Sequence, residues 1–224
     1  MGRLVGVVGL ICSAAALALA PLVLPASYSW VEHTTSESGA QGVDGAWLAR
    51  AGFVLFGLAV LWIASRRRCA WGRLATGLHV TFGVSMIAVA AFSLRSWLPG
   101  ATFDPTEDEL HSVAATVMGF AFAFGVLAAA VRRRTSGQPW RGGGLVAVAT
   151  SAGAPLGMAG VVSAGGGLPG RVVWGGLPWD WGGGGGGAPG RGGGGAPADE
   201  APQHRGAQPR QQQCADAFGD PFGL

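Results

Sequence analysis

Four apolar segments, each about 20 residues long, constrain this 224-residue chain more than any other feature. The hydrocarbon core of a bilayer is about 30 Å thick, and about 20 residues of α-helix cross it. The segments are residues 4–24, 46–65, 74–94 and 111–131. Only 12% of the residues are charged, against about 25% in an ordinary soluble domain, which excludes a soluble enzyme built on one large core. The sequence therefore predicts an all-α, polytopic transmembrane helix bundle.

A fifth segment, residues 145–164, is a weaker candidate for a span. It consists largely of alanine and glycine, and Pro155 stands near its middle. Small residues and an internal proline are tolerated in membrane helices that pack closely against their neighbours. We therefore expect five spans, with residues 1–164 forming the transmembrane domain.

The charges between the spans are sorted by sign. One side holds nine arginines and no acid: Arg3, Arg66, Arg67, Arg68, Arg73, Arg132, Arg133, Arg134 and Arg141. The other holds seven acids, Glu32, Glu37, Asp44, Asp104, Glu107, Asp108 and Glu109, with two arginines, Arg50 and Arg95. Because arginine-rich loops stay in the cytoplasm, this asymmetry predicts a multi-pass cell-membrane protein with a cytoplasmic N-terminus and extracytoplasmic acidic loops.

The first span has two interpretations, a retained helix or a cleaved signal peptide. Its apolar run of about 20 residues exceeds the 7–15 residues of a typical signal core. The residues Leu24-Pro25-Ala26 also fit a small-x-small cleavage site poorly. We therefore favour a retained helix.

The tail, residues 165–224, differs in composition from everything before it. It contains uninterrupted glycine runs at 182–187 and 192–195, which offer almost nothing to bury and predict disorder. A flexible Gly/Pro tail is one interpretation. The other is a frameshift near residues 165–171: the chain has no lysine or asparagine, as expected of a very GC-rich gene, and such DNA read out of frame encodes chiefly Gly, Pro, Arg and Ala. In that case a sixth span has been lost or replaced.

One loop and the helix after it resemble a known family. The loop reads Phe103-Asp104-Pro105-Thr106-Glu107-Asp108-Glu109-Leu110-His111-Ser112. It is preceded by Phe82-Gly83-Val84-Ser85-Met86 and Ala91-Phe92-Ser93. The helix after it continues as Val113-Ala114-Ala115-Thr116-Val117-Met118-Gly119-Phe120. This acid-rich loop running into Leu-His-Ser is similar to the bacterial membrane family catalogued as domain of unknown function 998, over about residues 5–165. The resemblance implies a bundle of about six helices and no established activity. The chain departs from it where glycine replaces the sixth helix.

Glu107, Asp108 and His111 form the main candidate site, where the fourth span begins. If the helix starts at or just before Thr106, all three lie on its first turns, where carboxylates favour the positive end of the helix dipole. Thr106 and Glu109 also match a capping box. A well-capped helix start is therefore the favoured interpretation.

The alternative interpretation is a metal or proton site made by the same three side chains. Glu32 and His33 from the first acidic loop would complete it. Carboxylate and imidazole are plausible ligands for divalent metals. However, the spacing matches no His-Glu-x-x-His motif and supplies no recognisable third ligand, so we predict no cofactor.

Two further polar residues lie inside spans. His79 stands in the third span, where an ionisable side chain is either functional or hydrogen-bonded to a neighbouring helix, and we favour the structural interpretation. Arg50 stands one turn inside the second span. It either reaches to the headgroups, which we favour slightly, or pairs with Asp104 or Asp108.

The bilayer is the only partner that the sequence indicates. Two arginine triplets serve as topology determinants and are candidates for anionic lipid contact: Arg66, Arg67, Arg68, Arg132, Arg133 and Arg134. They lack the interleaved aromatic residues of a nucleic-acid-binding surface. Since no catalytic or nucleotide-binding motif is present, we expect a non-enzymatic structural, sensing or interaction protein. A small transporter or lipid-handling protein, and a membrane enzyme using Asp108 and His111, remain alternatives.

Overall fold

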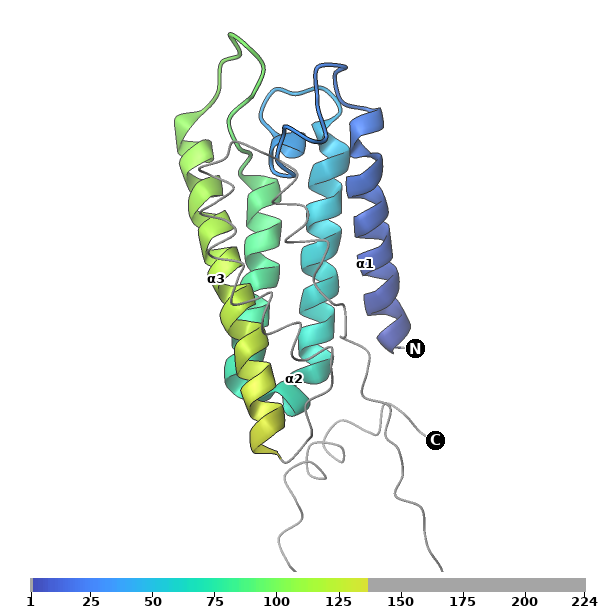
Figure 1. The fold of residues 1–224 in the computed structure, drawn as a ribbon, viewed down its shortest axis with the longest axis vertical. Helices are drawn as coiled ribbons and strands as arrows, with labels where there is room; N and C mark the ends of the chain where they lie inside the picture. The colour runs from blue at the N-terminus through green and yellow to red at the C-terminus, as the bar shows by residue number, and fades with distance from the viewer. Residues whose placement is uncertain (1, 137–224) are drawn as a thin grey trace, which may run out of the picture. The chain divides into compact units, whose positions relative to one another are not determined.

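The computed structural model describes residues 2–136, which form three long helices and two short 3₁₀ turns (Figure 1). The helices are α1 (Gly2–Leu19), α2 (Ala46–Ala91) and α3 (Pro105–Thr135), and the turns are η1 (Ala20–Leu22) and η2 (Glu37–Gly39). Every regular element of this part of the chain is helical, which confirms the predicted all-α class. The predicted fifth span, residues 145–164, and the tail lie outside the described residues.

Helix α2 is two antiparallel arms rather than one rod. Its 46 residues would extend about 69 Å if straight, more than twice the hydrocarbon thickness. At Gly72 the backbone leaves the helical region, with φ 78° and ψ 172°, and the chain turns back (Figure 1). We call residues 46–71 the first arm and residues 73–91 the second arm. The two arms correspond to the second and third predicted spans, although the first arm continues through the arginine triplet.

The two arms approach each other most closely where both carry glycine. A Cβ atom added at Gly57 would lie 2.6 Å from the carbonyl oxygen of Gly83, so the backbones are nearly in contact. Beside this point the rings of Phe56 and Phe82 meet edge to face, with centroids 5.7 Å apart. Small residues that permit close backbone approach are the usual basis of helix association in lipid.

The outer helices pack on different arms of α2. Helix α1 lies against the first arm, where a Cβ at Gly9 would be 3.0 Å from that of Ala59, and the Ser13 hydroxyl donates to the Gly52 carbonyl at 2.8 Å. Helix α3 lies against the second arm, where the Phe82 and Phe122 rings are 5.3 Å apart. The described helices therefore alternate in direction, α1 up, first arm down, second arm up and α3 down, as Figure 1 shows.

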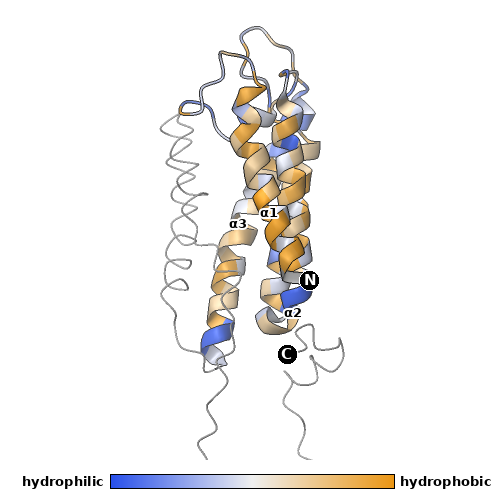
Figure 2. Cartoon of the chain, turned by 90° about the vertical axis from the view of Figure 1, so that its right-hand side faces the viewer, coloured by the Kyte–Doolittle hydropathy of each residue, from blue (hydrophilic) through white to orange (hydrophobic). Residues whose placement is uncertain are grey.

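All three helices are long and apolar enough to cross a membrane, and their most apolar windows of 18 residues have mean hydropathies of 2.3, 1.9 and 2.1. Apolar residues make up most of the helices, as the orange ribbons in Figure 2 show, and many of the large ones are exposed. Leu4 is 67% exposed and Phe124 is 54% exposed. Exposed apolar surface of this extent marks contact with lipid or with another apolar partner. The chain is a membrane protein, and four of the predicted spans overlap these helices, although the first and third were predicted to end beyond Leu19 and Ala91.

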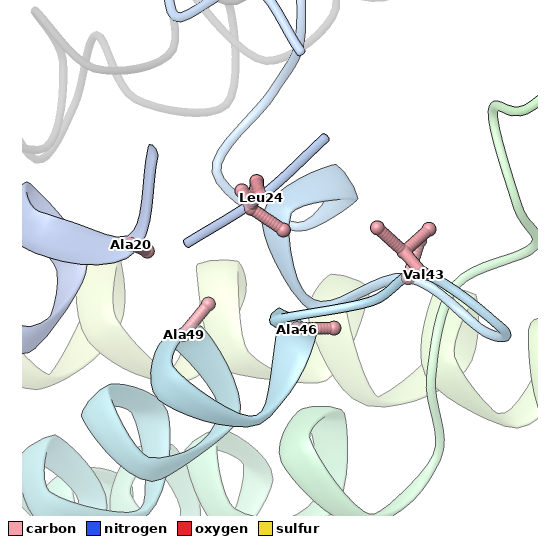
Figure 3. Close-up of a cluster of buried hydrophobic side chains, with 6 residues drawn as sticks. Ala20, Leu24, Val43, Ala46 and Ala49 are labelled. Atoms are coloured by element: carbon pink, nitrogen blue, oxygen red, sulfur yellow. The ribbon is translucent and has the colours of Figure 1, made fainter. Parts of the chain in front are cut away.

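The connections at the N-terminal end of α2 form what we call the loop cap, residues 23–45 and 92–104. Small apolar residues close its base against the bundle: Ala20, Leu24, Ala40, Val43, Ala46 and Ala49 (Figure 3). Gly45 makes this packing possible with φ 81°, because a Cβ there would lie 2.0 Å from the Val23 carbonyl oxygen. The opposite end of the bundle, which carries Gly72 and the arginine triplets, we call the arginine end.

Candidate functional site

The predicted start of α3 is nearly correct, but the residue that caps it differs from the expectation. The helix begins at Pro105, and Asp104 is its N-cap: Asp104 Oδ1 accepts from the backbone N–H of Thr106 at 2.8 Å and of Glu107 at 3.4 Å. The predicted capping box of Thr106 and Glu109 is therefore wrong. Asp is a strong N-cap and proline suits the first helical position, so Asp104-Pro105 was the better signal.

Glu107, Asp108 and His111 all bind the backbone of one short segment, the start of the 92–104 connection. Glu107 Oε1 accepts from Ser93 N–H at 3.0 Å, and Asp108 Oδ1 accepts from Arg95 N–H at 2.8 Å. His111 is buried, and its Nδ1 lies 2.8 Å from the carbonyl oxygen of Phe92. Since a carbonyl only accepts, Nδ1 carries the proton. The three side chains form a clamp that fixes the end of α2 to the start of α3.

Of the two residues expected to complete a metal site, His33 has its ring engaged elsewhere, and Glu32 forms a hydrogen bond through its backbone. His33 stacks on Tyr28 and Trp97, with ring centroids 5.2 and 4.4 Å away, and its Nδ1 accepts from Ser29 N–H. The backbone N–H of Glu32 donates to the Ser29 hydroxyl. Within residues 2–136, no three His, Cys, Asp or Glu side chains gather as a metal-binding group. The geometry of the described chain thus favours the capping interpretation.

Gln41 joins the two parts of the loop cap, a role that was not predicted from the sequence. Its buried side-chain amide donates to the carbonyl oxygens of Ser93 at 2.8 Å and Asp104 at 3.1 Å. Its Oε1 accepts from Asp104 N–H at 2.7 Å, and its own N–H donates to Leu94 O at 2.9 Å. One side chain therefore satisfies backbone groups at both ends of the second connection.

A capping box does occur in the loop cap, around η2 instead of α3. The Thr34 hydroxyl accepts from Glu37 N–H at 3.2 Å, and the Glu37 carboxylate accepts from Thr34 N–H in return. The Glu37 carbonyl then accepts from the indole N–H of Trp97 at 3.0 Å. This reciprocal pair holds the first connection in the position where Trp97, from the second, docks on it.

In the described chain, Arg50 binds backbone carbonyls of the first connection, not the expected partners Asp104 or Asp108. Its Nε donates to the carbonyl of Gly39 and its Nη2 to that of Ala40, each at 2.9 Å. The guanidinium group thus fastens the first connection to the first arm. Arg50 also lines an open cavity of about 460 Å³, shared with Gln41, Asp104 and Glu107.

His79 is buried at the interface between the second arm and α3. Its Nδ1 lies 2.7 Å from the carbonyl oxygen of Ala75, and its ring centroid is 4.3 Å from that of Trp71. A Cβ added at Gly125 would lie 3.0 Å from the imidazole Cε1, so the ring fills the space that this glycine leaves. These contacts agree with the structural interpretation of His79.

The structure brings the two arginine-bearing stretches together at the arginine end. The Arg132 side chain lies over the turn at Gly72, since a Cβ there would be 2.9 Å from Arg132 Nε. The guanidinium carbon of Arg66 lies 5.5 Å from the ring centroid of Trp62, as in a cation–π contact. The turn of α2 and the last turn of α3 therefore share one basic surface.

The fold agrees with a comparison to protein families. Residues 5–182 match the family described as "Protein of unknown function (DUF998)", which is more than half of the chain. The chain belongs to this family. The DUF998 match begins in α1 and continues past residue 165 into the tail, so it includes all of α2, α3 and the loop cap. No match was found among curated proteins or among solved structures.

Proposed function

We propose that this DUF998 protein is a non-enzymatic component of a bacterial cell envelope that presents the loop cap outside the membrane as a rigid sensing or interaction element. One observation carries the proposal. The three best candidates for chemistry each form a side-chain hydrogen bond with the backbone of residues 92–95: Glu107, Asp108 and His111. Their arrangement supports a role in shaping the cap. The N-terminus then lies in the cytoplasm, as the sorting of arginines and acids predicts.

Substitutions that keep the acceptor oxygen but remove the charge test the structural role. In Glu107→Gln and Asp108→Asn, the amide oxygen still accepts from Ser93 or Arg95 N–H, so we expect thermal midpoints in detergent close to that of the wild type. Glu107→Ala and Asp108→Ala lose the acceptor and should each lower the free energy of unfolding by about 1–3 kcal/mol. Alanine variants as stable as the wild type would contradict the proposal, because the carboxylates would then be available for chemistry.

Metal content provides an independent check on the enzymatic alternative. Purified wild-type protein and His111→Ala are compared for bound zinc and manganese by elemental analysis. The proposal expects the same metal content in both proteins. Stoichiometric metal that is lost with His111→Ala would instead support a metal site at the loop cap.

The orientation is tested by labelling single cysteines in intact cells. Cys12, Cys69 and Cys214 are the native cysteines. A variant that retains only Cys69 reports on the arginine end, and Ala101→Cys in a cysteine-free background reports on the exposed second connection. An impermeant maleimide should label the cysteine at 101 and should reach Cys69 only after lysis. The reverse pattern would overturn the proposed topology.

We also propose that the arginine end contacts anionic lipid headgroups. The contact between Arg132 and the Gly72 turn supports this, because it brings one arginine of the second triplet beside the turn that follows the first triplet. Juxtamembrane arginines contribute about 1 kcal/mol each to binding of anionic membranes. Replacing Arg133 and Arg134 by glutamine should weaken retention of anionic over zwitterionic lipid during purification. Unchanged lipid selectivity would leave these residues as topology determinants alone.

A further inference from the structure

The cavity at the loop cap is lined by charged side chains of both signs, Arg50 on one side of the balance and Asp104 and Glu107 on the other. Its volume is about 460 Å³, within the usual range for small-molecule sites. It lies between the start of α2, which supplies Arg50, and the start of α3, which supplies Glu107. The two connections supply Gln41, Thr102, Phe103 and Asp104. The cavity is therefore framed by elements that the hydrogen bonds of the cap hold in place.

The hydrogen bonds of the cap use only part of each charged group. Arg50 donates from Nε and Nη2 to two loop carbonyls, Asp104 accepts through Oδ1, and Glu107 accepts through Oε1. Among the described residues, this leaves Arg50 Nη1 and the second carboxylate oxygens of Asp104 and Glu107 outside the hydrogen bonds of the cap, on three residues that line the cavity. The remaining recognition groups are thus one cationic donor and two anionic acceptors.

This pattern fits a zwitterion better than a simple ion. The two carboxylates would repel a lone phosphate, and the guanidinium would repel a lone divalent cation. A ligand with a phosphate for Arg50 and a primary ammonium for Asp104 and Glu107 satisfies all three groups by charge-assisted hydrogen bonds. The ammonium must be primary or secondary, since a quaternary ammonium has no hydrogen to donate.

The position of the cavity also suits a lipid headgroup. Arg50 lies one turn inside α2, next to a turn that carries Trp47, which is 65% exposed. Phe103 lines the cavity and is 43% exposed. Exposed aromatic rings at the end of an apolar helix are typical of the interfacial layer of a bilayer.

We propose that the loop-cap cavity binds a zwitterionic group that combines a phosphate and a primary ammonium, carried by a phosphatidylethanolamine headgroup or by a small soluble compound of the same chemistry. The inference names a ligand class for the element that the proposed function places outside the membrane. Binding is measured on purified protein, so it does not depend on orientation. Labelling of the cysteine at 101 tests orientation separately.

The first experiment compares lipids that differ only in the ammonium. The full chain is placed in nanodiscs of phosphatidylcholine with trace fluorescent phosphatidylethanolamine or phosphatidylcholine, and binding is read by energy transfer from a donor at Ala101→Cys. We expect phosphatidylethanolamine to bind at least about tenfold more tightly, the equivalent of one charge-assisted hydrogen bond. Equal binding of the two lipids, with no competition by soluble phosphoethanolamine, would overturn the proposal.

Soluble competitors identify the source of the ligand. Phosphoethanolamine and phosphocholine are titrated against the labelled lipid. Displacement by phosphoethanolamine but not by phosphocholine supports the proposed chemistry. If phosphoethanolamine binds while the protein shows no preference between the two lipids, the ligand is a soluble compound. Displacement by inorganic phosphate at the same concentration would contradict the requirement for an ammonium.

Matched variants assign the binding to the cavity. Glu107→Gln keeps the bond to Ser93 but removes the charge, so the preference should fall about tenfold. Glu109→Gln is the control, because Glu109 is exposed on the same helix and does not line the cavity. If Glu107→Gln does not fold, Asp104→Asn, which keeps the N-cap acceptor, provides the same test. A preference unchanged in every folded cavity variant would overturn the proposal.

Discussion

The two ends of the bundle connect helices in different ways. At the loop cap, two connections of more than ten residues are held by buried or half-buried side chains that bind backbone groups, with Gln41, Arg50 and His111 among them. At the arginine end, the arms of α2 join at a single non-helical glycine, and Arg132 covers the turn. The cap thus has a defined internal structure that the other end does not need, since a tight turn has few backbone groups to satisfy.

This difference indicates that polar residues have opposite roles at the two ends. In the cap they stabilise one particular loop conformation, so removing a hydrogen-bonding atom should cost more than removing a charge. At the arginine end the charges set orientation and lipid contact, so charge should matter more than hydrogen-bond geometry. The following substitutions test that contrast, in order of decreasing expected effect.

Gly45→Ala should abolish folding. Its Cβ would lie 2.0 Å from the Val23 carbonyl oxygen, and φ is 81°, so neither the side chain nor the backbone can adjust. We expect a loss of more than about 4 kcal/mol, seen as loss of the monodisperse peak in detergent. Gly42→Ala is the control: φ is 65°, but no atom lies within 4 Å, so only backbone strain of about 1–2 kcal/mol applies. Equal behaviour of the two variants would mean that the base of the cap is not closely packed.

Gln41→Leu should destabilise the cap by about 2–3 kcal/mol, because it leaves the buried Ser93 carbonyl and the part-buried Asp104 N–H without the partner that Gln41 supplies. The measurement is denaturant titration in detergent, followed by tryptophan fluorescence. Gln41→Glu is the informative comparison, since its protonated carboxyl keeps the acceptor for Asp104 N–H but has one donor hydrogen where the amide has two. Its stability should fall between those of Gln41→Leu and the wild type at a pH that protonates the new carboxyl. Wild-type stability for Gln41→Leu would disprove the joining role of this side chain.

Gly72→Ala tests the arginine end and should cost about 1–3 kcal/mol, because φ 78° with ψ 172° belongs to a region open essentially to glycine alone. The steric contact is with the end of the flexible Arg132 side chain, which can move aside. The loss should therefore be smaller than for Gly45→Ala, and it should persist in an Arg132→Ala background. Full rescue by Arg132→Ala would show that the contact, not the backbone, sets the cost.

The spans could be predicted from sequence because apolar length is a local property. The same is true of the start of α3, where only the capping residue was misassigned: Thr106 and Glu109 matched a pattern, while Asp104-Pro105 carried the cap. The role of Gln41 could not be predicted, since its partners are 52 and 63 positions away and become neighbours only when both connections close. The partners of Arg50 could not be predicted for a related reason. They are backbone carbonyls, which every residue carries, so the sequence does not distinguish them.

The role of the candidate site could not be decided from the sequence either. Acidic residues near a histidine at the start of a helix indicated either capping or chemistry, and composition alone could not separate the two. What separates them is the position of residues 92–95, whose backbone groups face Glu107, Asp108 and His111. That position depends on where α2 ends, three residues before the predicted end of the third span.

Ser93→Ala should have the smallest effect, although Ser93 lies at the centre of the clamp and is only 1% exposed. Its backbone N–H and carbonyl carry the bonds to Glu107 and Gln41, and alanine keeps both. Within the described residues, its buried hydroxyl has no hydrogen-bond partner, so removing it relieves an unsatisfied polar group. We expect a change within about 0.5 kcal/mol of the wild type, or slight stabilisation, in the same denaturant titration. A loss above about 1 kcal/mol would show that the hydroxyl binds a further group. Ser93 would then stabilise the cap through its side chain as well as through its backbone.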